Sequence, residues 1–200
     1  MNRKIKDMAL ISIFSALIIM LALVPGIGYI PVGPIRATTI HIPVIIGSII
    51  FGPKKGAILG FVFGLTSLIN NTVSPTITSF VFSPFYAGGN LWSLVICFLP
   101  RILIGVVPYY VYNFLKKFIK NEHLDLGVAG FLGSITNTVL VMNLIFFCFK
   151  NQYAAANNIA PGELYDVILG INSINGVVEA VLAMLVTSLV TKVLLRVYRG

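Results

Sequence analysis

The chain has 200 residues, of which 58% are hydrophobic and 10% charged, and its mean hydropathy is +0.97. A soluble domain carries about 25% charged residues, so this composition excludes a water-soluble globular protein and places the chain among integral membrane proteins. The net charge of +8 lies in short basic clusters between apolar runs, which is the pattern of orientation signals in the lipid bilayer and not of a nucleic-acid surface.

The first half of the chain contains three predicted helical spans, over 5–24, 40–51 and 56–69. Crossing about 30 Å of hydrocarbon takes roughly 20 helical residues, so the second and third spans are short. Irregular backbone at membrane depth is tolerated only where it is buried in protein or lines a cavity. With the Pro/Gly-rich loop before them and the long loop after them, these spans predict a pocket open to the outside and covered by loops. The alternative is that loop residues extend both helices.

The second half of the chain contains three longer predicted spans, over 91–115, 128–149 and 167–195. The polar and aromatic loop NNTVSPTITSFVFSPFYAGGN precedes the fourth span, and the charged segment KKFIKNEHLDLG follows it. We therefore predict an all-α integral membrane protein. Its single domain, over 1–200, is a bundle of six transmembrane helices whose outer loops cover a substrate pocket.

The basic residues indicate the orientation of this bundle. Six spans place both termini on one side of the membrane. Eleven of the fourteen basic residues would then face that side: Arg3, Lys4, Lys6, Lys54, Lys55, Lys116, Lys117, Lys120, Lys192, Arg196 and Arg199. Since cytoplasmic loops carry an excess of Lys and Arg, we expect a multi-pass protein of the cell membrane with cytoplasmic N- and C-termini.

Two ionisable residues, Arg101 and Glu179, lie near the middle of the fourth and sixth spans. A charged group in hydrocarbon is costly and normally faces a partner or a wet cavity. One interpretation is a structural Arg–Glu pair that holds the two spans together. The other is that Arg101 receives an anionic group of a substrate, while Glu179 orients it or binds another polar group.

Three asparagines and two aromatic residues are further candidates for the pocket. Asn172 and Asn175 share one face of the sixth span with the acidic residue, and Asn143 lies in the outer half of the fifth span. Amide side chains both donate and accept hydrogen bonds, so they suit a polar solute, but they also join helices. Trp92 and Tyr86 are expected at the outer boundary, either as pocket walls or as an interfacial aromatic belt.

Small residues form stripes on two spans. Three glycines spaced four apart lie on one face of the third span: Gly56, Gly60 and Gly64. The first span has a comparable stripe: Ala9, Ser12 and Ala16. Such stripes let helices approach closely. We expect the glycines to pack inside the bundle, whereas the first span offers either packing or a smooth surface on which another membrane protein docks.

Signatures of catalysis are absent from the sequence. His41 and His123 are the two histidines, Cys97 and Cys148 are the two cysteines, and no spacing among them is typical of a metal site. The segment GPKKG lacks the spacing and the Ser/Thr of an ATP-binding Walker A loop. We therefore expect neither an enzyme nor a cofactor, and any energy from ATP has to come from a partner.

The ordered motifs TIHIPVIIGSIIFGPKKGAILGFVFGLTSLI, SFVFSPF, FLPRILIGV, GSITNTVLVMN and NGVVEAVLAML carry a family resemblance. With the small residues of the first span, they resemble the S components of energy-coupling-factor (ECF) vitamin transporters over nearly the whole chain. The resemblance implies a six-helix subunit that binds a vitamin near the outer face. It also implies a transmembrane coupling protein and two ATPase subunits as partners, with Ala9, Ser12 and Ala16 as the docking surface.

Within this family the chain looks most like the pantothenate-type members, because TTIHIP and SFVFSPF occur together. Pantothenate has a carboxylate, two hydroxyls and an amide, which Arg101 and the asparagines could serve. Folate or riboflavin remains an alternative substrate. A stand-alone secondary transporter or channel is the alternative of another class.

Overall fold

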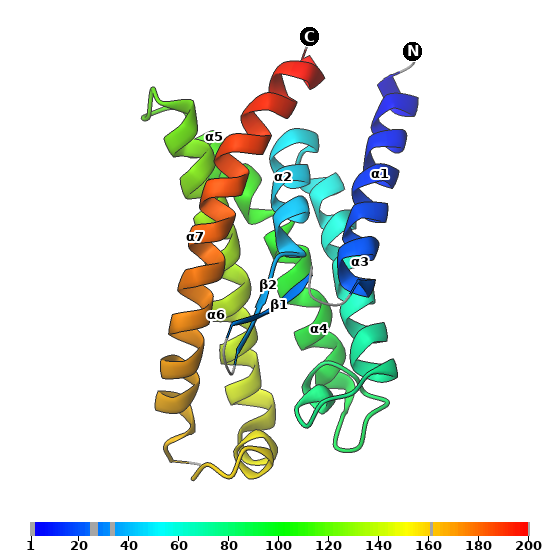
Figure 1. Ribbon diagram of the computed structural model, residues 1–200, viewed down its shortest axis with the longest axis vertical. Helices are drawn as coiled ribbons and strands as arrows, with labels where there is room; N and C mark the ends of the chain where they lie inside the picture. Colours follow the sequence, from blue (N-terminus) through cyan, green and yellow to red (C-terminus); the bar gives the residue numbers. More distant parts are fainter. Residues whose placement is uncertain (1–2, 25–27, 33–34, 161, 200) are drawn as a thin grey trace.

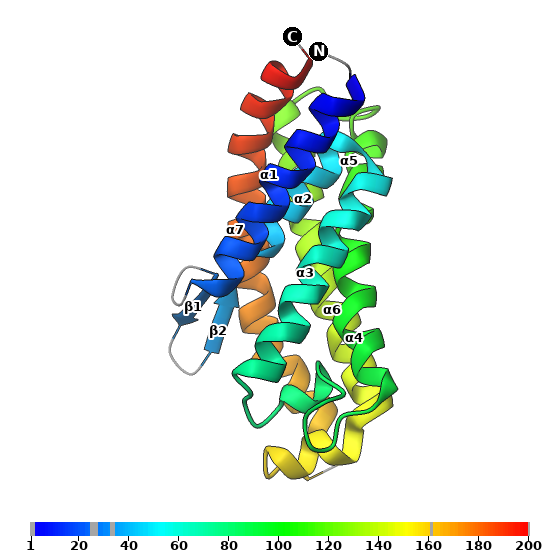
Figure 2. The ribbon, with the colours of Figure 1, turned by 90° about the vertical axis from the view of Figure 1, so that its right-hand side faces the viewer.

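In the computed structural model, the described part of the chain forms seven α-helices, which pack as one elongated bundle (Figure 1). The structure describes residues 3–24, 28–32, 35–160 and 162–199, and its side-chain account leaves out 3–4, 29–32, 35–37, 171–175 and 199. The helices are α1 (Arg3–Leu23), α2 (His41–Phe51), α3 (Pro53–Val73), α4 (Leu91–Ile104), α5 (Val107–Leu115), α6 (Glu122–Ala156) and α7 (Leu164–Arg199). Both chain ends lie at the same end of the bundle (Figures 1 and 2).

Within the described residues, five helical segments are long and apolar enough to cross a membrane, with α4 and α5 counted together, and α2 is a shorter apolar helix. The predicted all-α membrane fold is thereby confirmed, and the predicted count of six spans agrees with five long segments plus α2. The fourth span, predicted as continuous over 91–115, is interrupted between α4 and α5.

The two spans that were predicted to be short differ in length in the structure. The third helix is not short, because it begins at Pro53 and continues to Val73, so it has 21 residues in place of the predicted 56–69. Here loop residues extend the helix, as the alternative interpretation held. By contrast, α2 keeps 11 residues and is buried from His41 to Ile49. A helix enclosed by protein need not match the thickness of the hydrocarbon.

A short hairpin stands where the sequence suggested only a Pro/Gly-rich loop. Strands β1 (Tyr29–Val32) and β2 (Ile35–Thr38) pair antiparallel, with Tyr29 opposite Thr38 and Val32 opposite Ile35. The backbone N–H of Thr39 donates to the carbonyl of Gly28 at 3.0 Å and closes the open end of the hairpin. Figure 2 shows the hairpin on one side of the bundle, beyond the end of α1.

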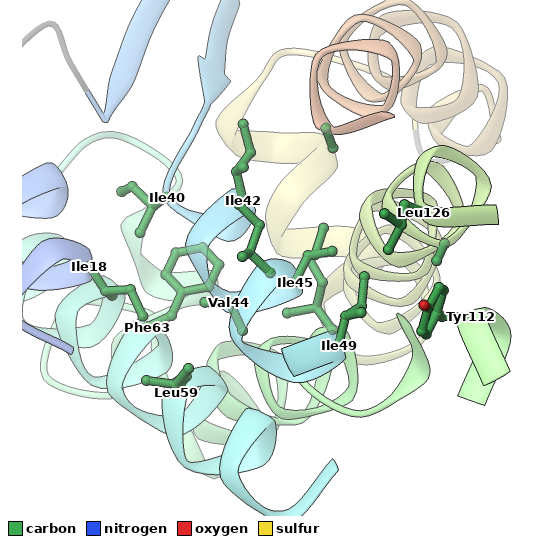
Figure 3. Packing of buried hydrophobic residues seen from close by; sticks show 14 of the residues in the cluster. Ile18, Ile40, Ile42, Val44, Ile45, Ile49, Leu59, Phe63, Tyr112 and Leu126 are labelled. Carbon is green, nitrogen blue, oxygen red and sulfur yellow. The ribbon is translucent and has the colours of Figure 1, made fainter. Parts of the chain in front are cut away.

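The core is organised around α2. In Figure 3 its side chains lie at the centre, with Phe63 and Leu59 of α3 on one side and Leu126 of α6 on the other. A second apolar cluster fills the opposite half of the bundle, where Phe80 and Phe149 pack with ring centroids 5.6 Å apart. Val141 and Ile145 of the second cluster also line the polar cavity described next.

The predicted glycine stripe packs α3 against α4. A Cβ placed on Gly60 would lie 2.1 Å from the carbonyl oxygen of Arg101, and one on Gly56 would lie 1.9 Å from that of Gly105. Only a hydrogen at Cα allows backbones to approach so closely. The stripe therefore fixes the position of the α4 backbone at Arg101.

Candidate binding site

A polar cavity of about 370 Å³ opens in the half of the bundle away from the chain ends. It lies between α3, α4, α6 and the loop that joins α3 to α4, and the end of β2 also reaches it. Its lining residues are Thr38, Ser67, Asn70, Asn71, Ser74, Thr76, Thr78, Phe82, Arg101, Val141, Met142, Ile145 and Tyr153. Hydroxyls and amides thus face an apolar wall from α6, with one guanidinium among them.

Arg101 is held in place by its own helix and by two aromatic rings. Its Nη1 donates to the carbonyl of Ile96 at 2.9 Å, and its guanidinium carbon lies 4.9 Å from the ring centroid of Phe82 and 5.6 Å from that of Phe63. In a regular helix that carbonyl would accept from residue 100, but Pro100 has no N–H. The guanidinium therefore donates to a carbonyl that Pro100 leaves without its helical donor, and Arg101 as a whole is 8% exposed.

The loop between α3 and α4 is pinned by a buried hydroxyl. The Oγ of Ser79, which is fully buried, accepts from the backbone N–H of Thr76 at 2.8 Å and donates to Oδ1 of Asn71 at 2.9 Å. Nδ2 of Asn71 donates back to the carbonyl of Ser67 at 2.8 Å. This chain of hydrogen bonds joins the loop to the last turns of α3 and fixes one wall of the cavity.

The start of α4 anchors the other end of the loop. Oδ1 of Asn90 accepts from the backbone N–H of Trp92 at 2.8 Å, and Oγ of Ser93 accepts from that of Asn90 at 3.1 Å, which makes a capping box. The Ser93 hydroxyl also donates to the carbonyl of Phe80 at 2.7 Å. The helix start and the loop are therefore one hydrogen-bonded unit.

Comparison with known proteins identifies the family. The model of the family described as "ECF transporter, substrate-specific component" matches residues 6–191. The chain belongs to this family. The resemblance seen in the sequence is thereby confirmed, and this S component is a membrane transport subunit and not an enzyme.

Two relatives of this S component have printed names. A protein named "Pantothenic acid transporter PanT" from Lactococcus lactis subsp. cremoris is 40% identical over 190 residues, which cover 88% of this chain and 94% of the relative. A "Pantothenate transporter PanT" from Leuconostoc mesenteroides subsp. mesenteroides is 30% identical, with 96% of this chain and 94% of the relative covered.

A solved structure shows the same fold. The crystal structure of the S component for biotin from an ECF-type ABC transporter superposes with a TM-score of 0.57 and 20% identity, and the match covers 96% of this chain and 93% of the other. At this identity the likeness supports the fold alone. Family and fold together make this chain a multi-pass protein of the plasma membrane.

The residues predicted for the site of this S component are found in several places. Arg101 lines the cavity. Asn143 is half-buried, donates from Nδ2 to the carbonyl of Val139 at 2.7 Å, and lines a separate apolar groove between α6 and α7. Trp92 is 54% exposed at the start of α4, and Tyr86 packs against the apolar cluster around Phe80. The side chains of Asn172 and Asn175 lie outside the described residues.

Glu179 is buried, with 9% exposure, and its Oε1 accepts from the backbone N–H of Thr38 at 2.6 Å and from its hydroxyl at 3.2 Å. The contacts given above for Arg101 are with Ile96 and two aromatic rings. A structural pair between Arg101 and Glu179 stays a prediction.

Sequence reasoning missed most of the polar cavity wall. It predicted a pocket beneath the loop but singled out neither Thr38 nor the polar residues of the segment from Ser67 to Thr78. The signal was present, because NNTVSPTITS is a stretch rich in hydroxyl and amide side chains between two apolar runs. What the sequence did not reveal is which of these side chains turn inward.

The predicted docking residues lie on the open side of α1: Ala9, Ser12 and Ala16 are all exposed. At the N-terminal end of this helix, Asp7 forms an ion pair with Lys55 of α3 and accepts a hydrogen bond from the Tyr198 hydroxyl of α7 at 2.7 Å. These contacts hold α1 on the bundle and leave its small residues uncovered.

Proposed function

We propose that this chain is the S component of an ECF importer for pantothenate and that the vitamin binds in the cavity around Arg101. The observation that carries the proposal is the 40% identity, over nearly the full length of both chains, to a protein named as a pantothenic acid transporter. The chemistry of the cavity supports it independently of that name.

The groups in the cavity match those of the vitamin. A guanidinium pairs with a carboxylate through two parallel hydrogen bonds, and such a pair is stronger in a buried site than in water. The hydroxyls of Thr76 and Thr78 and the amide of Asn70 can serve the two hydroxyls and the amide of pantothenate. The apolar wall of α6 suits its methyl groups. The volume of about 370 Å³ lies within the range of about 300–1,000 Å³ that is usual for small-molecule sites.

Calorimetry on the purified protein in detergent tests the substrate. We expect saturable binding of pantothenate and none of folate or riboflavin at the same concentrations. Binding of one of the other vitamins in place of pantothenate would contradict the substrate assignment. Uptake of pantothenate into liposomes by this chain alone, driven by an ion gradient, would contradict the assignment to an ATP-driven complex.

Transport requires partners under this proposal. A transmembrane coupling protein docks on Ala9, Ser12 and Ala16 of α1, and two ATPase subunits supply the energy. The exposure of the three side chains supports this docking surface, because close helix packing in a membrane needs small residues on an open face.

We propose further that the end of the bundle with both termini faces the cytoplasm. Lys54 and Lys55 begin α3, Lys117 follows α5, and Lys192 and Arg196 lie in the last turns of α7, all toward that end (Figure 1). An excess of basic residues favours the cytoplasmic side, so the cavity opens to the outside. Labelling of Lys117→Cys by a membrane-impermeant thiol reagent only after the cells are opened would agree, whereas labelling on intact cells would not.

A further inference from the structure

We propose that Glu179 is a positioning residue that holds the end of β2 in the wall of the cavity through Thr38 and does not itself touch the substrate. The inference rests on the proposed function, since it assigns the role of Glu179 in the same site. It differs from both interpretations of the sequence, which were a structural pair with Arg101 and a role of this carboxylate at the substrate.

One carboxylate oxygen of Glu179 accepts two hydrogen bonds from Thr38, one from its backbone N–H and one from its hydroxyl. The distances from Oε1 of Glu179 are 2.6 Å to the backbone nitrogen of Thr38 and 3.2 Å to its hydroxyl. Hydrogen bonds to a charged acceptor are about twice as strong as neutral ones, and Glu179 is 9% exposed. The contact joins residues 141 positions apart in the sequence, on α7 and β2. It therefore ties the hairpin to the last helix.

The backbone N–H of Thr38 needs such an acceptor. Opposed residues in an antiparallel pair alternate between hydrogen-bonded and non-hydrogen-bonded positions. Thr39 donates to Gly28, so the neighbouring pair of Tyr29 and Thr38 is non-hydrogen-bonded and the N–H of Thr38 points away from β1. A buried N–H without an acceptor is costly, because no water is available to replace the missing partner. Glu179 supplies the missing partner.

Thr38 is the residue through which this contact reaches the cavity. It ends β2, lines the cavity and lies three residues before the first residue of α2, His41. The imidazole of His41 is 1% exposed and lies beside the backbone of both Thr38 and Glu179, so the junction is packed on that side as well. A shift of Thr38 would thus move part of the cavity wall.

Charge argues against direct contact between Glu179 and the proposed substrate. Pantothenate carries a carboxylate, and two like charges in a poorly solvated site repel each other strongly. The carboxylate of Glu179 already has the Thr38 donors as partners, whereas the guanidinium of Arg101 lines the cavity. Within this proposal, Arg101 attracts the substrate and Glu179 positions Thr38.

Hydrogen exchange combined with ligand kinetics tests this role. In ligand-free protein, Glu179→Ala should speed exchange of the Thr38 amide about tenfold or more, because a charge-assisted hydrogen bond is lost. Pantothenate should then dissociate about tenfold faster. Glu179→Gln keeps an acceptor oxygen at the same place and should show a smaller change in both. The matched control is Thr187→Val, a buried polar residue two turns further along α7.

The outcomes separate this inference from the proposed function. Unchanged exchange at Thr38 in Glu179→Ala, together with lost binding, would mean that Glu179 is a direct ligand and would overturn the inference. If Glu179→Ala does not fold, Glu179→Leu, which also lacks an acceptor, takes its place, and unchanged exchange together with unchanged dissociation in that variant overturns the inference. If the wild type does not bind pantothenate, the proposed function fails, while the exchange of Thr38 still decides whether Glu179 holds the hairpin.

Discussion

Pro100 and Arg101 act together, because the side chain of Arg101 donates to the carbonyl that Pro100 cannot serve. A proline inside a membrane helix removes one N–H and leaves a carbonyl that must be satisfied within the protein. The side chain of the next residue satisfies it, and in doing so its guanidinium is directed to the cavity between two aromatic rings. The arrangement is pre-organised, because the guanidinium need not be ordered when an anion arrives.

Replacement of Arg101 should therefore abolish tight binding. Arg101→Ala removes one partner of a buried charge pair, a loss of about 2–5 kcal/mol, which corresponds to an affinity about 30-fold to several thousand-fold lower. Arg101→Lys should also bind weakly, because an ammonium lacks the planar fork and the stacking. Calorimetry with pantothenate measures both.

The matched control for Arg101 is Lys150→Ala. Lys150 is also a cation beside an aromatic ring, 5.1 Å from the centroid of Phe146, but it is exposed on α6. Its removal should leave the dissociation constant unchanged. Equal losses in Arg101→Ala and Lys150→Ala would show that general charge, and not the guanidinium in the cavity, accounts for binding.

At the scale of elements, the contact of α3 with α4 positions Arg101. Gly60→Ala would place a Cβ 2.1 Å from the carbonyl oxygen of Arg101, and backbone cannot yield as a flexible side chain can. Overpacking costs about 1–3 kcal/mol. We expect a lower thermal midpoint in detergent and, because the displaced backbone is that of Arg101, weaker pantothenate binding as well.

Gly170→Ala serves as the control for Gly60. It is also a helical glycine, but nothing lies within 4 Å of an added Cβ. The substitution should be neutral or stabilise α7 by up to about 1 kcal/mol, since alanine favours helix. A Gly60→Ala protein as stable and as tight a binder as Gly170→Ala would contradict the close packing of α3 and α4.

The sequence predicted the apolar helices well and the polar segments poorly, for physical reasons. A long apolar run crosses a bilayer as an α-helix, so these helices can be predicted from composition. The end of α3 was assigned to a loop because Asn71 and Thr72 are polar, yet both side chains donate to carbonyls four residues back, Ser67 and Leu68, and the helix continues. Hydrogen bonds of this kind, from a side chain to a carbonyl of its own helix, cannot be recognised from the hydropathy of the sequence.

The same reasoning explains which residues of the candidate site could be predicted from the sequence and which could not. Arg101 could be predicted because an intramembrane charge needs a special environment. Asn143 looked equally suitable, but its amide donates to its own helix at Val139. Thr38 could not be singled out, because its position depends on a hairpin with four-residue strands and on a contact with Glu179 far along the chain.

At the scale of the whole molecule, the bundle places the two proposed sites apart. The cavity lies in the half away from the chain ends, whereas α1 lies along the outside and is pinned by Asp7 to Lys55 and Tyr198 at the other end (Figure 2). Under the proposed function, substrate binding and partner docking therefore use different residues. Changes on the open side of α1 should affect transport without affecting affinity.

Ala16→Trp tests this separation. A large ring on the small-residue stripe of α1 would prevent close approach of a coupling helix, because backbones approach closely only over small side chains. We expect pantothenate binding by the isolated subunit within about twofold of wild type, which is less than about 0.5 kcal/mol. ATP-dependent uptake in proteoliposomes with the coupling protein and ATPases should be lost. Leu17→Phe, also exposed on α1 but outside the stripe, should retain uptake. Normal uptake by Ala16→Trp would place the docking surface elsewhere.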